Sequence, residues 1–143
     1  MSEYTIERLL GGTEIIGRSI HSEMDLYELG KTGIPKRSLL YLAGRINLSL
    51  RVISRILHVT ERTIQRKNDQ DRLNEALSEH IIQIAEVYSR GSEVFDTTDD
   101  FQVWAETVNH ALGNKTPIEL LSSRYGAQMV LDELGRIEHG VFA

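Results

Sequence analysis

The sequence of 143 residues contains no cysteine, only two prolines and few aromatic side chains (6%). The absence of cysteine excludes disulfide bonds, thiolate metal sites and cysteine nucleophiles. No hydrophobic run approaches the roughly 18 residues that a membrane-spanning helix requires. The N-terminal stretch carries Glu3 and Glu7 where a signal peptide would have a basic segment followed by an apolar one. We therefore expect a cytoplasmic protein that does not contact the membrane.

Residue patterns that support catalysis or cofactor binding are also missing. The glycines form no phosphate-binding loop, and no serine lies in a nucleophile-elbow motif. The histidines have neither metal-ligand spacing nor a carboxylate pair beside them. They are His21, His58, His80, His110 and His139. We therefore predict no enzyme activity, no catalytic residue, no cofactor and no bound metal ion.

Charge is distributed unevenly along the chain, which the net charge of −5 conceals. Residues 1–30 hold two basic residues against six acidic ones, a balance of −4. Residues 31–67 hold nine against one, a balance of +8, and residues 68–143 hold five against fourteen, a balance of −9. A basic centre between acidic flanks is typical of a nucleic-acid-binding face. The alternative is a solvated helical surface that happens to be basic.

The stretch Ser49–Lys67 is typical of two short helices joined by a tight turn. Ser49 and Thr60 are suited to cap these helices, because a hydroxyl oxygen accepts a hydrogen bond from a free backbone amide there. Ile64 is expected to point from the second helix into the core. His58 occupies the turn position that usually holds glycine, because this residue needs a positive φ angle, which histidine tolerates better than most residues. The pattern predicts a helix-turn-helix; the alternative is a helical hairpin that only packs within the core.

The outward positions of this stretch carry side chains suited to DNA. Arginine and glutamine on the second helix can form bidentate hydrogen bonds with guanine and adenine in the major groove. Arg51, Arg55 and Lys67 are better placed for phosphates, which fix the register of the protein and supply salt-dependent affinity. The residues predicted to bind operator DNA are Arg51, Arg55, Arg62, Thr63, Gln65, Arg66 and Lys67.

The rest of the chain is also predicted to be helical, which gives an all-α fold. Apolar residues at steps of three and four predict a long helix from a cap at Asn74 to about Phe95. Phe101, Trp104 and Val108 are expected to share one face of a short helix. A threonine followed by proline and, three residues after the threonine, by glutamate starts another helix, and the last helix is predicted to end at a glycine near the C-terminus.

We expect four segments along the chain. They are an N-terminal arm at residues 1–24, a helix-turn-helix DNA-binding region at 25–72, a connecting helix at 73–97 and a small helical domain at 98–143. The arm is the expected dimer surface, through Ile6, Leu9, Ile15 and Ile16.

Several motifs resemble one known family. The C-terminal ones are Ala111-Leu112-Gly113, Thr116-Pro117, Leu120-Leu121 and Leu134-Gly135-Arg136-Ile137-Glu138-His139-Gly140. Upstream, Gly33-Ile34-Pro35 and Thr60-Glu61-Arg62-Thr63-Ile64-Gln65-Arg66 are similar to the helix-turn-helix region of the same family. The family is that of Xre/ParS-type antitoxins, whose partners are RES-domain toxins. The likeness covers roughly residues 25–143.

The resemblance implies a protein with two partners. Such antitoxins form homodimers that bind and neutralise a toxin, and they also bind operator DNA to regulate their own transcription. RES-domain toxins are similar to ADP-ribosyltransferases and consume NAD, so that cofactor would belong to the partner. The C-terminal domain would then bind the toxin near its active-site entrance, with Arg136, Glu138, His139 and Phe142 as the expected contacts. The alternative is a stand-alone helix-turn-helix transcription regulator.

Overall fold

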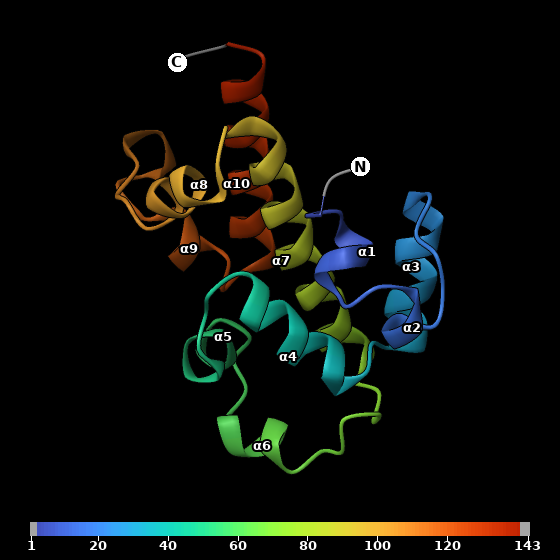
Figure 1. Ribbon diagram of the computed structural model, residues 1–143. Coiled ribbons are helices and arrows are strands. Elements are labelled where there is room, and N and C mark those ends of the chain that lie inside the picture. Colours follow the sequence, from blue (N-terminus) through green and yellow to red (C-terminus); the bar gives the residue numbers. More distant parts are fainter. Residues whose placement is uncertain (1–2, 141–143) are drawn as a thin grey trace. The chain divides into compact units, whose positions relative to one another are not determined.

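The computed structural model describes residues 3–140, and this part of the chain is helical with no β-strand, which confirms the predicted all-α fold. The helices are α1 (Ile6–Leu9), α2 (Thr13–Ile16), α3 (Glu23–Thr32), α4 (Lys36–Arg45), α5 (Leu50–Ile56), α6 (Glu61–Gln65), α7 (Glu75–Val94), α8 (Thr98–Ala105), the 3-10 helix η1 (His110–Leu112), α9 (Pro117–Leu120) and α10 (Arg124–Glu138). The chain divides into two compact units between Glu86 and Val87, partway along α7 (Figure 1). The segment boundaries drawn from the sequence stay a prediction.

Helix α4 is central to the N-terminal unit, because α1, α2 and α5 all pack against it (Figure 1). Leu39 and Leu42 of α4 are fully buried, as is Ile53 of α5. Leu9 of α1 and Ile16 of α2 are buried in the same unit. The two glycines between α1 and α2 have positive φ angles, which let the arm turn back on itself. Leu9 and Ile16 are therefore core residues, so they do not form part of the predicted dimer surface.

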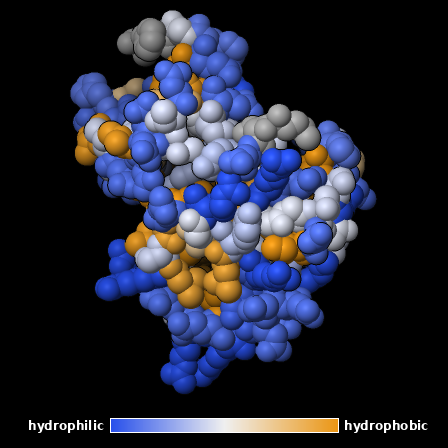
Figure 2. Space-filling model, in the orientation of Figure 1, coloured by the Kyte–Doolittle hydropathy of each residue, from blue (hydrophilic) through white to orange (hydrophobic). Residues whose placement is uncertain are grey.

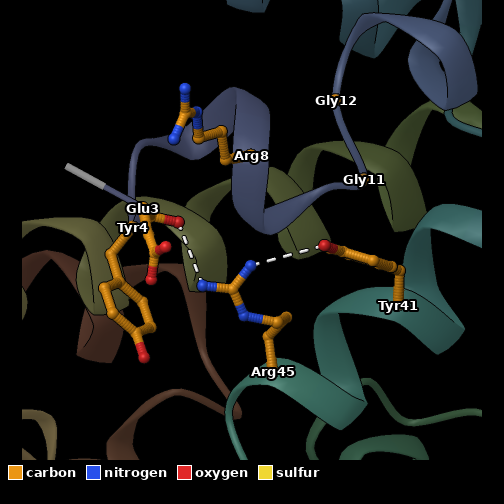
Figure 3. A pocket seen from close by; sticks show the side chains of 7 residues that line it. All are labelled: Glu3, Tyr4, Arg8, Gly11, Gly12, Tyr41 and Arg45. Atoms are coloured by element: carbon orange, nitrogen blue, oxygen red, sulfur yellow. Dashed lines mark hydrogen bonds between the residues drawn. The ribbon is translucent and has the colours of Figure 1, made fainter. Parts of the chain in front are cut away.

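Arg45 joins the arm to α4. Its guanidinium donates hydrogen bonds to the Glu3 carbonyl oxygen at 3.1 Å and to the Tyr41 hydroxyl at 3.4 Å, as Figure 3 shows. It also lies over the ring of Tyr4, 4.8 Å from the centroid. Partial burial lowers the pKa of Arg45, but its bonds with Tyr41 and Tyr4 raise it above its ordinary value, so the side chain stays charged. A polar pocket of about 390 Å³ opens beside it.

The connector between α6 and α7 is held against the start of α4 by backbone hydrogen bonds. The amides of Lys36 and Arg37 donate to the carbonyl oxygens of Asp71 and Asp69 at 2.8 and 2.9 Å, and the Leu73 amide donates to Ile34 at 2.8 Å. These bonds occupy amides of the first turn of α4, which would otherwise have no partner within the helix. The polar connector is therefore a fixed part of the N-terminal unit.

Helix α7 matches the long helix predicted from the sequence. Its first turn is capped as expected, because the Asn74 side-chain oxygen accepts a hydrogen bond from the Leu77 amide at 2.8 Å. Ile81 and Ile84 are fully buried on its apolar face.

Across residues 3–140, none of the helices combines the length and the hydrophobicity needed to cross a bilayer.

The C-terminal unit is built on a cluster of aromatic rings. Tyr88 and Phe101 meet edge to face with their centroids 5.1 Å apart, and Phe95 lies 5.6 Å from Trp104. The predicted shared face of Phe101, Trp104 and Val108 is partly wrong. Helix α8 ends at Ala105, and Val108 follows it with 60% of its surface exposed. Val108 follows Trp104 at helical spacing, so the periodicity of apolar residues predicted it on the same face. The helix ends before Val108, however, and leaves it exposed.

Replacement of Gly91 by alanine is expected to destabilise the C-terminal unit. A Cβ atom at Gly91 of α7 would lie 2.3 Å from the Phe101 ring. Overpacking of this kind costs about 1–3 kcal/mol. The matched control is Gly135→Ala in α10, where a Cβ meets no atom within 4 Å and alanine favours the helix by up to about 1 kcal/mol. Urea unfolding of both variants checks the prediction, and equal effects at the two sites would contradict it.

Candidate DNA-binding surface and C-terminal binding surface

Helices α5 and α6 form the helix-turn-helix with the predicted caps. The Ser49 hydroxyl accepts from the Val52 amide at 3.1 Å, and the Thr60 hydroxyl accepts from the Thr63 amide at 3.0 Å. Between them, His58 has the positive φ angle that the turn requires, 60°. Ile64 of α6 is fully buried. Burial of this single side chain fixes which face of the short helix points outward.

Substitutions at His58 are expected to separate backbone strain from side-chain chemistry. His58→Val should destabilise the N-terminal unit by about 1–3 kcal/mol, because a β-branched residue is strained at a positive φ angle. His58→Gly should keep the turn, because glycine adopts this conformation without a steric penalty. Thermal unfolding of both variants followed by circular dichroism measures the difference. A valine variant as stable as the glycine variant would contradict this account of the turn.

The predicted DNA-binding side chains lie around α5 and α6, with differing exposure. Arg51, Arg55, Arg62, Thr63, Gln65 and Arg66 are exposed, whereas Lys67 is half-buried. Within residues 3–140, none of the five basic side chains in this set forms an ion pair with a carboxylate, so their charges are directed to solvent. Figure 2 shows strongly hydrophilic side chains over α6, at the bottom of the view. The arrangement supplies a cationic surface around a short helix, and the major groove of DNA admits an α-helix.

Two details change the chemistry expected of individual residues. The Thr63 hydroxyl lies 2.8 Å from the Thr60 hydroxyl, so it is already engaged at the helix cap. Two further cations, Lys36 and Arg72, are bound to carbonyl oxygens of Lys67 and Gly33 inside the N-terminal unit. No local pattern in the sequence indicates these bonds, because each joins residues more than thirty positions apart.

The predicted toxin contacts lie at the end of α10. Arg136 pairs with Glu133 one turn earlier at 2.8 Å. Glu138 accepts a hydrogen bond from Arg90 of α7 at 2.5 Å, which ties the two helices of the C-terminal unit together. His139 caps α10 with 72% of its side chain exposed. The remaining predicted contact, Phe142, lies outside the described residues.

Sequence reasoning missed three exposed apolar side chains in the C-terminal unit. They are Val103, Val108 and Tyr125, with 66%, 60% and 80% of their surfaces exposed. Large exposed apolar groups are a feature of protein-binding surfaces when they gather in a patch. Within the described part of the chain, no group of three histidine or acidic residues is placed to hold a metal ion.

The protein therefore has a helix-turn-helix with unpaired cations on its second helix, followed by a second helical unit. This combination is typical of DNA-binding proteins of the helix-turn-helix class. Residues 25–86 match the Antitoxin Xre-like helix-turn-helix domain, and residues 90–140 match the Antitoxin Xre/MbcA/ParS C-terminal toxin-binding domain. The two matches assign to this chain both domains of the Xre/MbcA/ParS antitoxins.

A curated relative supports this assignment. The chain is 31% identical over 93 residues to a protein named Antitoxin Xre from Yersinia enterocolitica (serotype O:8 / biotype 1B, strain NCTC 13174 / 8081). The matched stretch covers 64% of this chain and 63% of the relative. The arm that contains α1 and α2 precedes both matched domains.

Proposed function

We propose that the protein is the antitoxin of a type II toxin–antitoxin system. Its C-terminal unit binds a RES-domain toxin and neutralises it by blocking the active site, so that NAD is consumed only by free toxin. Its helix-turn-helix binds operator DNA as a homodimer and represses transcription. The protein acts in the cytoplasm and catalyses no reaction itself.

The observation that carries this proposal is the match of residues 90–140 to a toxin-binding domain, over a stretch that lies within the second compact unit. This unit has exposed groups of two kinds: the polar end of α10 at Arg136 and His139, and the apolar side chains of Val103, Val108 and Tyr125. A protein interface commonly combines apolar contacts with a polar rim. The surplus of acidic residues after position 67 also suits a protein partner better than DNA.

Co-expression with the product of the neighbouring reading frame tests the proposal. If that product is a RES-domain toxin, expression of this chain should restore growth that the toxin alone arrests. Purified chain should also form a stable complex with the toxin and suppress its consumption of NAD. A folded chain that neither binds the toxin nor protects cells would contradict the proposal.

The second candidate is a stand-alone transcription regulator. This alternative is favoured by the cationic surface of α5 and α6, because all of its residues come from this chain and DNA binding through it would need no toxin. In that case the purified homodimer would bind the region upstream of its gene tightly, and affinity purification from cells would recover no toxin.

A further inference from the structure

Lys36 is a buried lysine at the start of α4. Only 9% of the residue is exposed, and its ammonium donates a hydrogen bond of 2.8 Å to the Lys67 carbonyl oxygen. The Asp69 carboxylate lies 4.0 Å from the same nitrogen. Lysine is almost never buried without partners, because removing its charge from water is costly. The two partners found here offset that cost, and both follow directly after α6 in the chain.

The bond from Lys36 holds the exit of α6. The Lys67 amide donates to Ile64 at 3.1 Å and the Arg66 amide donates to Arg62 at 3.0 Å, so Lys67 continues the last turn of the helix. Because the helix ends here, no backbone amide of a following turn donates to the Lys67 carbonyl oxygen. The Lys36 ammonium donates to it instead. The entry of α6 is held by the Thr60 cap and its middle by buried Ile64.

A helix of five residues such as α6 does not keep its shape alone, because isolated helices shorter than about 12 residues are marginal in water. Its orientation therefore depends on its attachments to the rest of the unit. Two of them, Thr60 and Ile64, belong to α6 and its turn, whereas Lys36 reaches it from α4 across 31 positions of sequence. Loss of the Lys36 side chain would remove the bond to Lys67 and leave the exit of α6 held only by the backbone bonds of Asp69 and Asp71 further along the connector, so the last turn of α6 would be held less firmly.

We propose that Lys36 is a positioning residue for DNA recognition, which sets the angle of α6 without contacting DNA. The proposal rests on the proposed DNA-binding function. Lys36 differs from Arg51 and Arg55, whose exposed guanidinium groups are directed to solvent. A group that is buried and already bonded to a carbonyl oxygen contributes to specific binding through geometry, whereas an exposed cation that contacts a phosphate contributes its charge to all sequences alike.

The test compares full-length Lys36→Met with Arg51→Ala on two duplexes of equal length. One contains the region upstream of the gene, and the other has a random sequence. Lys36→Met should weaken binding to the upstream duplex about tenfold, as expected for loss of a charge-assisted hydrogen bond, and should change binding to the random duplex less than about threefold. Arg51→Ala should weaken both duplexes alike and lower the slope of log K against log salt by about one.

Amide hydrogen exchange tests whether a loss of DNA affinity goes together with a loosened α6. Amides of residues 61–67 should exchange faster in Lys36→Met than in the unaltered chain, while amides of residues 77–86 in α7 keep their protection. Lys36→Gln and Lys36→Arg extend the series if the methionine variant fails to fold. Across the folded variants, loss of preference for the upstream duplex should follow the increase in exchange at 61–67.

Two results would overturn the role of Lys36. One is equal weakening of both duplexes with a lower salt slope, which would make Lys36 a phosphate contact. The other is a folded variant in which only one of the two effects occurs. Either the amides of α6 exchange faster while the preference for the upstream duplex is unchanged, or that preference is lost while exchange in α6 is unchanged. If the unaltered chain does not prefer the upstream duplex, the proposed operator binding itself fails, and that result is visible before any variant is measured.

Discussion

Simultaneous replacement of Arg62, Gln65 and Arg66 by alanine is expected to reduce operator binding at least about 100-fold, since each bidentate base contact is worth about 1–3 kcal/mol. All three side chains are exposed, and Ile64, which holds α6 in place, is unchanged. The fold should therefore keep its thermal stability. Titration of the upstream duplex at several salt concentrations measures both the loss of affinity and the change in salt slope.

The control for this triple variant removes the same amount of charge elsewhere. Lys115→Ala combined with Arg124→Ala deletes two exposed cations from the C-terminal unit. If DNA binding depends on the position of the cations, this control should keep nearly full affinity, apart from a small long-range effect that salt screens. Equal losses in both variants would show that only net charge matters and would contradict the assignment of α6 as the recognition helix.

Replacement of Arg136 and His139 by alanine is expected to weaken toxin binding by about 10–100-fold and to abolish protection of cells, because truncation of a few interface residues can remove most of the binding energy. Both side chains are exposed at the end of α10, and the Arg136 bond to Glu133 is a surface ion pair that contributes little to stability. The variant should therefore fold normally. Gln128→Ala with Asp132→Ala, on exposed positions earlier in α10, is the matched control.

Glu138 needs a separate experiment because it is bound to Arg90. If Glu138 serves the fold, Glu138→Ala and Arg90→Ala should lower stability to similar small extents and leave toxin affinity unchanged. If it contacts the toxin directly, Glu138→Ala should weaken toxin binding more than Arg90→Ala does. Calorimetric titration of each variant with purified toxin distinguishes these outcomes, and the bond seen between α7 and α10 favours the first.

Local signals were sufficient to predict most of the helix-turn-helix. Caps such as Ser49, Thr60 and Asn74 act on amides three residues later, so a short stretch of sequence specifies them. The positive φ angle of His58 also follows from its place in the turn. These features depend on backbone geometry that is the same wherever the motif occurs, so they need no knowledge of the rest of the chain.

Contacts between distant residues could not be predicted. The bond from Lys36 to Lys67 and the bond from Arg90 to Glu138 join residues 31 and 48 positions apart, and no pattern in a single sequence pairs them. Lys36 was therefore counted only as one of the nine basic residues of the stretch 31–67. Val108 shows the opposite error: its apolar spacing extends that of α8, but the helix ends before it and leaves it exposed.

In the proposed function, one chain binds DNA through α6 and a toxin through its C-terminal unit, with separate residues for each partner. The most direct test is the toxin affinity of the variant with alanine at Arg62, Gln65 and Arg66, measured by calorimetric titration after its loss of operator binding has been verified. We expect a toxin affinity within about threefold of that of the unaltered chain. A variant that is folded but has lost both activities together would contradict it.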